Sequence, residues 1–215
     1  MPELFVPDIF QNDAPLEVIR NFPLAQLICS NNDGIMATAS PIIIDDTRGN
    51  SDDLILIGHM AKANHQSTFM QSGQNILAIF SSPNAYISPD WYKERKTVPT
   101  WDYQSVHING AINIFDDHDQ HLDVLTKTIA HVERYKEPPW TMEKAPEGKV
   151  ESLLPRIISF EIVVERIQAI SRLSQMQTIV DRHSVIEGLR ARNQYGDLDV
   201  ASLIEAQMNA PSGGD

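Results

Sequence analysis

Residues 105–116 read SVHINGAINIFD, and the alternation in this segment decides the fold class. Successive side chains of a β-strand point to opposite faces, so a strand with one buried face alternates apolar and polar residues. The apolar parity carries Val106, Ile108, Ile112 and Ile114. The other parity carries Ser105, His107 and Asn113. The segment therefore predicts a long β-strand with one face on a hydrophobic core.

Further strands are predicted on both sides of this one. Apolar segments occupy residues 24–30, 35–45, 54–59, 75–82 and 157–170. The sequence Asn-Asn-Asp-Gly at 31–34 joins the first two segments and is typical of a hairpin turn. Residues 75–82 (NILAIFSS) are apolar throughout their centre, so we expect this strand to be buried on both faces.

Helical patterns separate and follow these strands. We expect helices at 13–21, at 62–72 and after Asp116 or Asp117, and two more at 181–208. Strands interrupted by helices favour a mainly β chain at the boundary of the α+β class, built as a partly closed antiparallel barrel of about six or seven strands.

The predicted domain organisation is simple. We expect a single domain over residues 1–209, with the barrel at roughly 20–170 and the C-terminal helices at roughly 181–209. The tail at 210–215 (APSGGD) is expected to be disordered, because nothing in it can be buried.

Charge and composition restrict the possible partners. The formal net charge of the 215 residues is −12, and nucleic-acid binding depends largely on neutralising phosphates, so direct DNA contact is disfavoured. No apolar segment is long enough to span a membrane, and the N-terminus lacks the pattern of a secretory signal. The single cysteine, Cys29, cannot form an intrachain disulfide. These features together predict a cytoplasmic protein.

The segment 86–110, YISPDWYKERKTVPTWDYQSVHING, is rich in aromatic residues. It contains five of the fifteen Phe, Trp and Tyr residues of the chain. Tyr and Trp combine an apolar face with a polar group, so they suit the wall of a site for a flat ligand. Packing at a corner of the barrel or at a dimer interface explains the same composition equally well.

A second polar segment, DDHDQH at 116–121, contains possible metal ligands. Asp117, His118 and His121 could share one helix face. The pattern also fits a capped, solvated helix start with acidic residues near the positive end of the helix dipole. We favour this second interpretation and predict no metal site.

Several segments of the chain together resemble one family. They are GHMAKAN (58–64), YISPDWY (86–92), VPTWDYQSVHINGAINI (98–114), EPPW (137–140), ISFEIVVERI (158–167), RLSQ (172–175) and DRHSVIEGL (181–189). In these the chain resembles the PaiB-like FMN-binding negative transcriptional regulators. That family is placed in the FMN-binding split-barrel superfamily, with the pyridoxamine-phosphate oxidases. The resemblance implies an antiparallel split β-barrel with peripheral helices, and FMN bound at a homodimer interface.

The resemblance also implies which residues contact the cofactor. Lys62 occupies the position of the phosphate-binding residue after a strand, where a dianion needs cationic and hydrogen-bonding partners. Its flanking residues in the resembling segment are His59, Ala61 and Asn64. Candidates for the wall of the flavin ring are Ser88, Trp91, Trp101 and Tyr103. The C-terminal contributors are Arg172 and Gln175.

At several positions the chain departs from the family pattern. These positions are Thr38, Ala39, Asp102, Ile170 and Met176. Two functions from different classes remain open. The first is an FMN-binding sensor, transcriptional regulator or weak flavin-dependent oxidoreductase, with no catalytic residue identified. The second is a degenerate family member that keeps the fold and dimer, binds no FMN and acts through protein partners.

Overall fold

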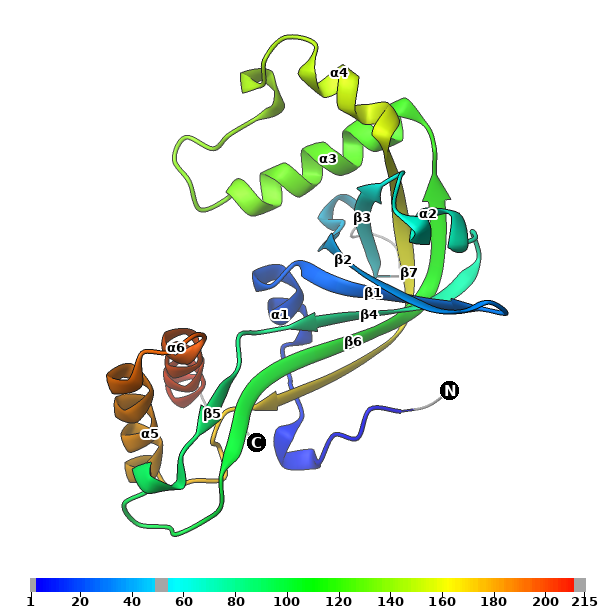
Figure 1. Cartoon of the computed structure of the whole chain (residues 1–215). Helices are drawn as coiled ribbons and strands as arrows, with labels where there is room; N and C mark the ends of the chain where they lie inside the picture. Colours follow the sequence, from blue (N-terminus) through cyan, green and yellow to red (C-terminus); the bar gives the residue numbers. More distant parts are fainter. Residues whose placement is uncertain (1–2, 49–53, 211–215) are drawn as a thin grey trace. The chain divides into compact units, whose positions relative to one another are not determined.

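The computed structural model describes residues 3–48 and 54–210 (Figure 1), so most of the tail predicted at 210–215 lies outside the described residues. The strands are β1 (Leu24–Asn31), β2 (Gly34–Ile44), β3 (Ile55–Ala61), β4 (Gln74–Ser81), β5 (Ala85–Ile87), β6 (Thr100–Phe115) and β7 (Ile157–Arg172). The α-helices are α1 (Pro15–Asn21), α2 (His65–Phe69), α3 (His118–Glu133), α4 (Lys149–Leu153), α5 (Ile179–Arg192) and α6 (Asp197–Asn209).

The strands of the described residues form one sheet in the order β4-β1-β2-β3-β7-β6-β5. An additional pairing joins β4 to β6, so six of these strands close into a barrel and β5 extends beyond it. The predicted hairpin is confirmed, because β1 and β2 pair antiparallel and Asn31 lies opposite Gly34. The fold class expected from the sequence, an antiparallel barrel of about seven strands with helices around it, is confirmed.

The chain forms two compact units, which we describe separately. The barrel unit contains residues 19–80 and 107–168, and the helical unit contains residues 1–18, 81–106 and 169–215. The long strands β6 and β7 contribute residues to both units. The single domain expected from the sequence stays a prediction.

In the barrel unit, β3 is buried on both faces. Helix α3 lies beside it (Figure 1), and Ile55 and Ile57 of β3 form a buried cluster with Val124 of α3. Leu56, of the opposite parity, is also fully buried. Burial on both sides explains why the sequence of this strand is almost continuously apolar.

Strand β4 differs from this expectation. Its side chains alternate between buried and half-buried or exposed, with Ile76, Ala78 and Phe80 forming the buried set. The prediction that this strand is buried on both faces was therefore wrong. Leu77 and Ile79 lie on its other face and are only half-buried. An apolar run cannot distinguish these cases, because it shows which residues tolerate burial and not what covers them.

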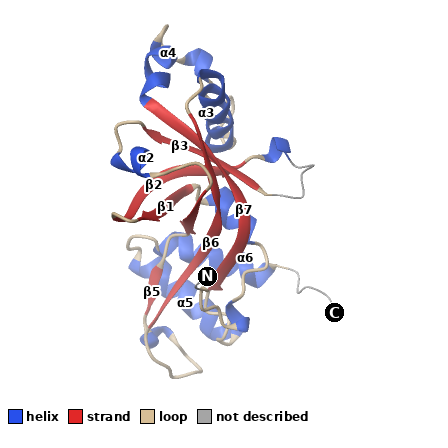
Figure 2. Ribbon diagram, turned by 90° about the vertical axis from the view of Figure 1, so that its right-hand side faces the viewer, coloured by secondary structure: helices blue, strands red, loops and turns tan. Residues whose placement is uncertain are grey.

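The helical unit has a core of its own. Helices α5 and α6 lie side by side next to β5 (Figure 2), and their apolar faces bury Ile87, Val185 and Val200. The short 3₁₀ helix Pro89–Trp91 brings the indole of Trp91 against α5 at Gly188. A Cβ atom at Gly188 would lie 2.4 Å from Cδ2 of this indole, so only glycine permits the contact.

The contact between Gly188 and Trp91 gives a test of the helical unit. Gly188→Ala should destabilise the protein by about 1–3 kcal/mol, because the added methyl group overpacks against a rigid ring. At an ordinary helical site the same change stabilises by up to about 1 kcal/mol, so the sign is diagnostic. Urea unfolding measures it, and the double variant with Trp91→Leu should recover part of the loss. A stabilising Gly188→Ala would contradict the packing.

Candidate functional site

The end of β3 and the turn after it, in the barrel unit, carry four of the candidate residues. Lys62 follows β3, and its Nζ atom contacts both carboxylate oxygens of Asp116, at 2.7 and 3.0 Å. Helix α2 begins only at His65 and has five residues, so the helix expected at 62–72 is shorter than predicted. The ion pair is largely exposed, with side-chain exposures of 48% for Lys62 and 65% for Asp116, so its contribution to stability is small.

The neighbours of Lys62 have structural contacts of their own. Asn64 is the N-cap of α2: its side-chain oxygen accepts from the N–H of Gln66, and its amide donates to Oγ1 of Thr38 at 3.2 Å. Ala61 ends β3 and pairs with Ile157 of β7. These contacts orient the turn and leave Lys62 as its cationic group.

His59 is half-buried on β3, and its Nδ1 atom is buried without a hydrogen-bond partner among the described residues. Burial lowers the pKa of its imidazole, so the neutral form is favoured. In the sheet His59 lies directly opposite Ser159 of β7, so the two side chains share one face. The candidate His59 therefore presents a neutral ring with one unsatisfied nitrogen.

His121, which the sequence suggested only as a possible metal ligand and which was assigned to a solvated helix start, belongs to this region. Its ring is almost fully buried, with Nδ1 3.0 Å from Oγ of Ser159 and Nε2 3.8 Å from Oδ1 of Asp116. The predicted cap is confirmed, since the carboxylate of Asp117 accepts from the N–H groups of Asp119 and Gln120. The expectation that the whole helix start is solvated was wrong at His121. His121 lies three residues before the buried Val124, and this helical spacing could have placed its side chain on the buried face of α3.

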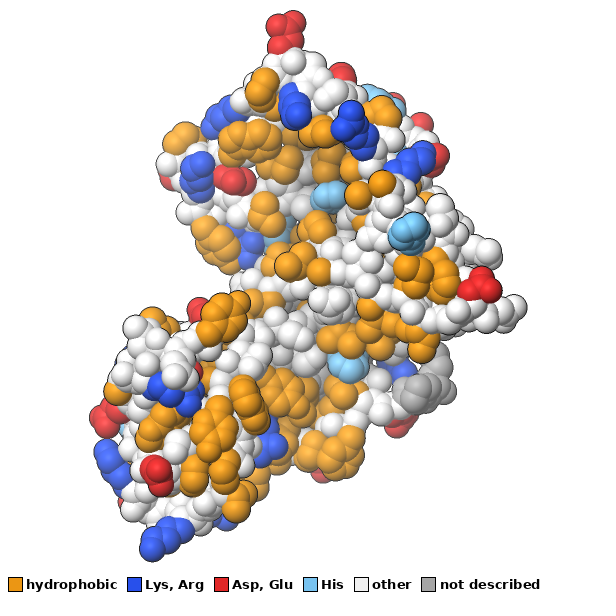
Figure 3. All heavy atoms as spheres, in the orientation of Figure 1, with side chains coloured by type: hydrophobic (Ala, Val, Ile, Leu, Met, Phe, Trp, Pro, Cys, Tyr) orange, Lys and Arg blue, Asp and Glu red, His pale blue; other side chains and the backbone are white. Residues whose placement is uncertain are grey.

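The aromatic segment of the helical unit divides into two groups. Trp91 is packed on α5, and the guanidinium of Arg192 lies 4.9 Å above its ring. Trp101 is 54% exposed and meets Tyr86 edge to face at 6.0 Å. Apolar side chains on the molecular surface are visible in Figure 3. Trp101 is thus the indole of this segment that a flat ligand can contact.

The remaining ring-wall candidates are less accessible. Ser88 caps the 3₁₀ helix, with Oγ accepting from the N–H of Asp90 at 3.3 Å. Tyr103 is half-buried in β6. Ser88 therefore has a structural role that does not require a ligand, and Tyr103 is only partly accessible.

The C-terminal candidates lie where β7 ends. Gln175 uses both ends of its amide inside the protein: Oε1 accepts from the N–H of Leu173, and Nε2 donates to the carbonyl oxygens of Ser171 and Ile9. Arg172 is half-buried, with its guanidinium 5.0 Å above the ring of Phe10. Gln175 is therefore occupied with structural contacts, whereas Arg172 has donors to offer.

Asp102 is fully buried in the helical unit, and burial raises the pKa of its carboxyl to about 6. Oδ2 accepts a 2.6 Å hydrogen bond from Ser174, whereas Oδ1 has no hydrogen-bond partner among the described residues. Strand β6 begins at Thr100, five residues before the predicted start, which places Asp102 on the buried parity of Val106. Continuing the alternation of β6 from Val106 towards the N-terminus would have predicted that Asp102 is buried.

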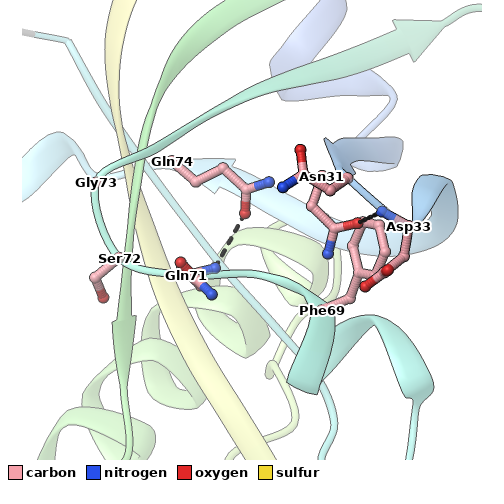
Figure 4. A pocket seen from close by; sticks show the side chains of 8 residues that line it. Asn31, Asp33, Phe69, Gln71, Ser72, Gly73 and Gln74 are labelled. Atoms are coloured by element: carbon pink, nitrogen blue, oxygen red, sulfur yellow. Dashed lines mark hydrogen bonds between the residues drawn. The ribbon is translucent and has the colours of Figure 1, made fainter.

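Two cavities contain none of the candidate residues. The first, of about 560 Å³, is lined at the β1–β2 turn and before β4 by residues that include Asn31, Phe69 and Gln74 (Figure 4). Its amides bind the local backbone, because Oδ1 of Asn31 accepts from Asp33 and Oε1 of Gln74 accepts from Gln71 (Figure 4). The second, of about 310 Å³, lies between α3 and the segment after it and is mainly apolar.

Residues 3–48 and 54–210 have neither a metal-ligand cluster nor a membrane-spanning helix. That part of the chain contains no cluster of three or more His, Cys, Asp or Glu side chains able to hold a metal ion. None of its helices combines the length and the apolar character needed to cross a membrane.

Asp102 gives a prediction for the pH dependence of stability. Its folded-state pKa of about 6 lies above the ordinary 3.8, so the stability of the fold should fall as the pH rises from about 4 to about 6. Asp102→Asn should remove this fall, which corresponds to roughly 2–3 kcal/mol. The measurement is the difference in unfolding free energy between variant and wild type at pH 4, 5, 6 and 7. A difference that stays constant with pH would contradict the raised pKa.

Known proteins place the chain in a family. Residues 4–166 match the family described as "Putative FMN-binding domain". The Bacillus subtilis protein named protease synthase and sporulation protein PAI 2 is 34% identical over 157 residues, which are 73% of this chain and 75% of the relative. An uncharacterized protein of Emericella nidulans is 29% identical over 227 residues, covering 84% of this chain and 90% of its own.

Solved structures show the same fold at low identity. A conserved hypothetical protein from Mycobacterium tuberculosis has a TM-score of 0.55 at 11% identity, over 81% of this chain and 94% of that chain. The flavocytochrome from Azotobacter vinelandii has a TM-score of 0.51 at 13% identity, over 75% of this chain and 68% of that chain. At these identities the similarity shows the fold alone. The family match spans well over half of the sequence, and the chain belongs to the PaiB-like family of FMN-binding domains.

Proposed function

We propose that this protein is a homodimer that binds FMN at the subunit interface, with Lys62 as a phosphate contact. Family membership supports a flavin ligand. The observation that carries the placement is the exposed cation that follows β3, paired with a carboxylate that is more exposed than the cation. FMN brings redox chemistry of its own, and the protein supplies position and electrostatics.

The residues of the β3 turn fit a phosphate group only in part. The ammonium of Lys62 is accessible, and a dianionic phosphate attracts it more strongly than a single carboxylate does. Asp116, however, lies 2.7 Å from this ammonium and repels an incoming anion. Binding of a phosphate therefore requires Lys62 to exchange Asp116 for the ligand. The pair is exposed, so this exchange costs about 1 kcal/mol or less.

The ring-wall candidates all belong to the helical unit, and one of them presents an exposed aromatic face. Trp101 exposes more than half of its surface, and an exposed indole offers a flat apolar face to a ring system. Trp91, Asn64 and Gln175 are already held by contacts inside the protein, so we assign them to shaping the fold rather than to the ring. His59 adds an unsatisfied nitrogen in the barrel unit.

The proposed dimer rests on an apolar face of the barrel unit. Residues directly opposite each other in a sheet share a face, and Ile28 of β1 lies opposite both Ala37 of β2 and Leu77 of β4. Next to them, Ala39 and Ile79 lie opposite Gln26. This set contains no charged side chain, and its alanines are exposed. A second copy of the chain that covers this face would bury it.

A regulatory role stays a prediction from the family resemblance. The net charge of −12 opposes binding to DNA phosphates, so regulation would act through a protein or a metabolite. The degenerate alternative, a dimer that binds no flavin, is separated from the proposal by the flavin titration that follows.

The competition for Lys62 predicts opposite effects of two substitutions on FMN affinity. Lys62→Ala should weaken binding about 10- to 100-fold, because a charge-assisted contact is lost. Asp116→Asn should strengthen binding by about threefold, because the competing carboxylate is neutralised. Fluorescence titration with FMN after removal of bound flavin measures both.

Asp199→Asn, an exposed carboxylate early in α6, controls for the change in net charge. If neither variant of the pair changes FMN affinity, the phosphate placement is wrong. If wild-type protein retains no flavin after desalting with excess FMN, the degenerate alternative replaces the proposal.

The apolar face predicts a variant that separates the subunits. Ala37→Glu should convert the dimer to a monomer, since an unpaired carboxylate buried in an interface costs several kcal/mol. The exposed Ala37 tolerates the change in the isolated subunit, so the circular dichroism spectrum should be kept. Size-exclusion chromatography with light scattering measures the mass, and Ser202→Glu on exposed α6 is the charge-matched control. An Ala37→Glu protein that stays dimeric would rule out this interface.

A further inference from the structure

We infer that the helical unit holds a second ligand site, a small cavity that takes a low-molecular-weight carboxylate bearing a hydroxyl group. The cavity has a volume of about 250 Å³. It lies between the segment that follows the Trp91 turn and the segment that ends β7. Its lining includes the polar side chains of Tyr92, Arg95, Arg172 and Gln177. This proposal does not depend on FMN binding, because neither Lys62 nor Trp101 lines the cavity.

The charge of the lining selects an anion. Two guanidinium groups, of Arg95 and Arg172, line the cavity, and no carboxylate residue does. The carboxylate that interacts with Arg172 is the buried Asp102, which also faces the cation of Arg182. The chain has more acidic than basic residues and a net charge of −12, yet the charged residues that line this cavity are all basic. A ligand with one or two carboxylates would neutralise it.

Arg172 is the centre of this site. Its guanidinium is half-buried and lies over the ring of Phe10, so one of its planar faces is covered. Within the described residues no acceptor is hydrogen-bonded to it. Arginine has five N–H donors in a planar fork that matches a carboxylate in two places. Arg95 uses one N–H on the carbonyl oxygen of Met176 at 3.1 Å, and its fork has further donors.

Two neutral polar atoms of the lining define what else the ligand carries. Oε1 of Gln177 is buried and has no hydrogen-bond partner in the described part of the chain. The hydroxyl of Tyr92 is also buried and lies close to the side chain of Ser174. Burial, with the charge of Asp102, raises the pKa of the Tyr92 hydroxyl, so it remains a donor. The amide oxygen of Gln177 can only accept. A ligand that combines a carboxylate acceptor with a hydroxyl donor satisfies both atoms.

The size of the cavity excludes larger ligands. Sites for drug-sized molecules occupy about 300–1,000 Å³, and this cavity lies below that range. FMN is such a molecule, so the cavity is too small to contain it. Arg172, which the sequence resemblance assigns to the flavin, is assigned here to this smaller anion.

The test is a calorimetric titration of malate into the purified protein, with succinate as the matched diacid that lacks the hydroxyl. Malate should bind, and succinate should bind about fivefold or more weakly, because Oε1 of Gln177 then stays unpaired. Arg172→Gln should weaken malate binding at least about tenfold. Arg190→Gln, which removes an equal charge from an exposed ion pair in the same unit, should leave it unchanged.

Tyr92→Phe removes one hydroxyl without changing shape, and should weaken malate binding several-fold if Arg172→Gln fails to fold. The titration is repeated with FMN at saturation, where unchanged malate affinity is expected. Absence of malate binding, equal affinity for succinate, or equal loss in Arg190→Gln would overturn the inference. Displacement of malate by FMN would assign the cavity to the flavin site instead. Malate binding by protein that retains no flavin would support this site and contradict the proposed function.

Discussion

The two-residue alternation of β6 is the constraint on which the rest of this structure depends. Through most of its sixteen residues one parity is buried and the other is half-buried, with Gln104 and Ser105 as exceptions, and the strand runs through both units of the chain. In the barrel unit the buried parity supplies Ile108 and Ile112. Gly110 lies between them, and a Cβ atom there would be 2.2 Å from the carbonyl oxygen of Val163. The glycine therefore allows the neighbouring strand β7 to approach β6 closely.

The same alternation places the carboxylate of Asp102 in the protein interior, where its charge is unfavourable unless other groups stabilise it. Asp102 occupies the buried parity of β6, and Ser174 from the end of β7 donates to one of its oxygens. Arg172 and Arg182 interact with it through their charges. Burial without an ion pair at hydrogen-bonding distance keeps its pKa high, since desolvation outweighs these attractions. When Asp102 is ionised, its negative charge therefore offsets part of the positive charge of Arg172.

In an acidic chain, the availability of cations decides where anions can bind. The guanidinium of Arg192 is held by both carboxylate oxygens of Asp197 and stacks on Trp91, so it serves the packing of the helical unit. Lys62 is paired but exposed, which makes it exchangeable. Arg172 lines a cavity and has donors left over. Arg192 is therefore a structural cation, whereas Lys62 and Arg172 can bind a ligand.

The sequence by itself determined the local structure. It predicted the β1–β2 hairpin from the Asn-Asn-Asp-Gly turn, a helix cap at Asp116 or Asp117, strands of the barrel and the apolar parity of β6. Each of these depends on residues within a few positions of one another, where φ/ψ preferences and side-chain periodicity act directly. The family resemblance added a list of candidate residues, which no local rule could sort.

Tertiary structure alone decided which candidates are free. Lys62 meets Asp116 across 54 residues, Asp102 meets Ser174 across 72, and Gln175 reaches Ile9 across 166. The register of β6 places Asp102, and a shift of one residue would move its side chain to the opposite face. Lys62, Asp116 and Ser174 follow the ends of strands, so the order of strands in the sheet brings them to their partners. The position of α3 likewise decided what covers Ile55 and Ile57 on one face of β3. An apolar sequence states that burial is tolerated, and only the arrangement of the other elements supplies the covering surface.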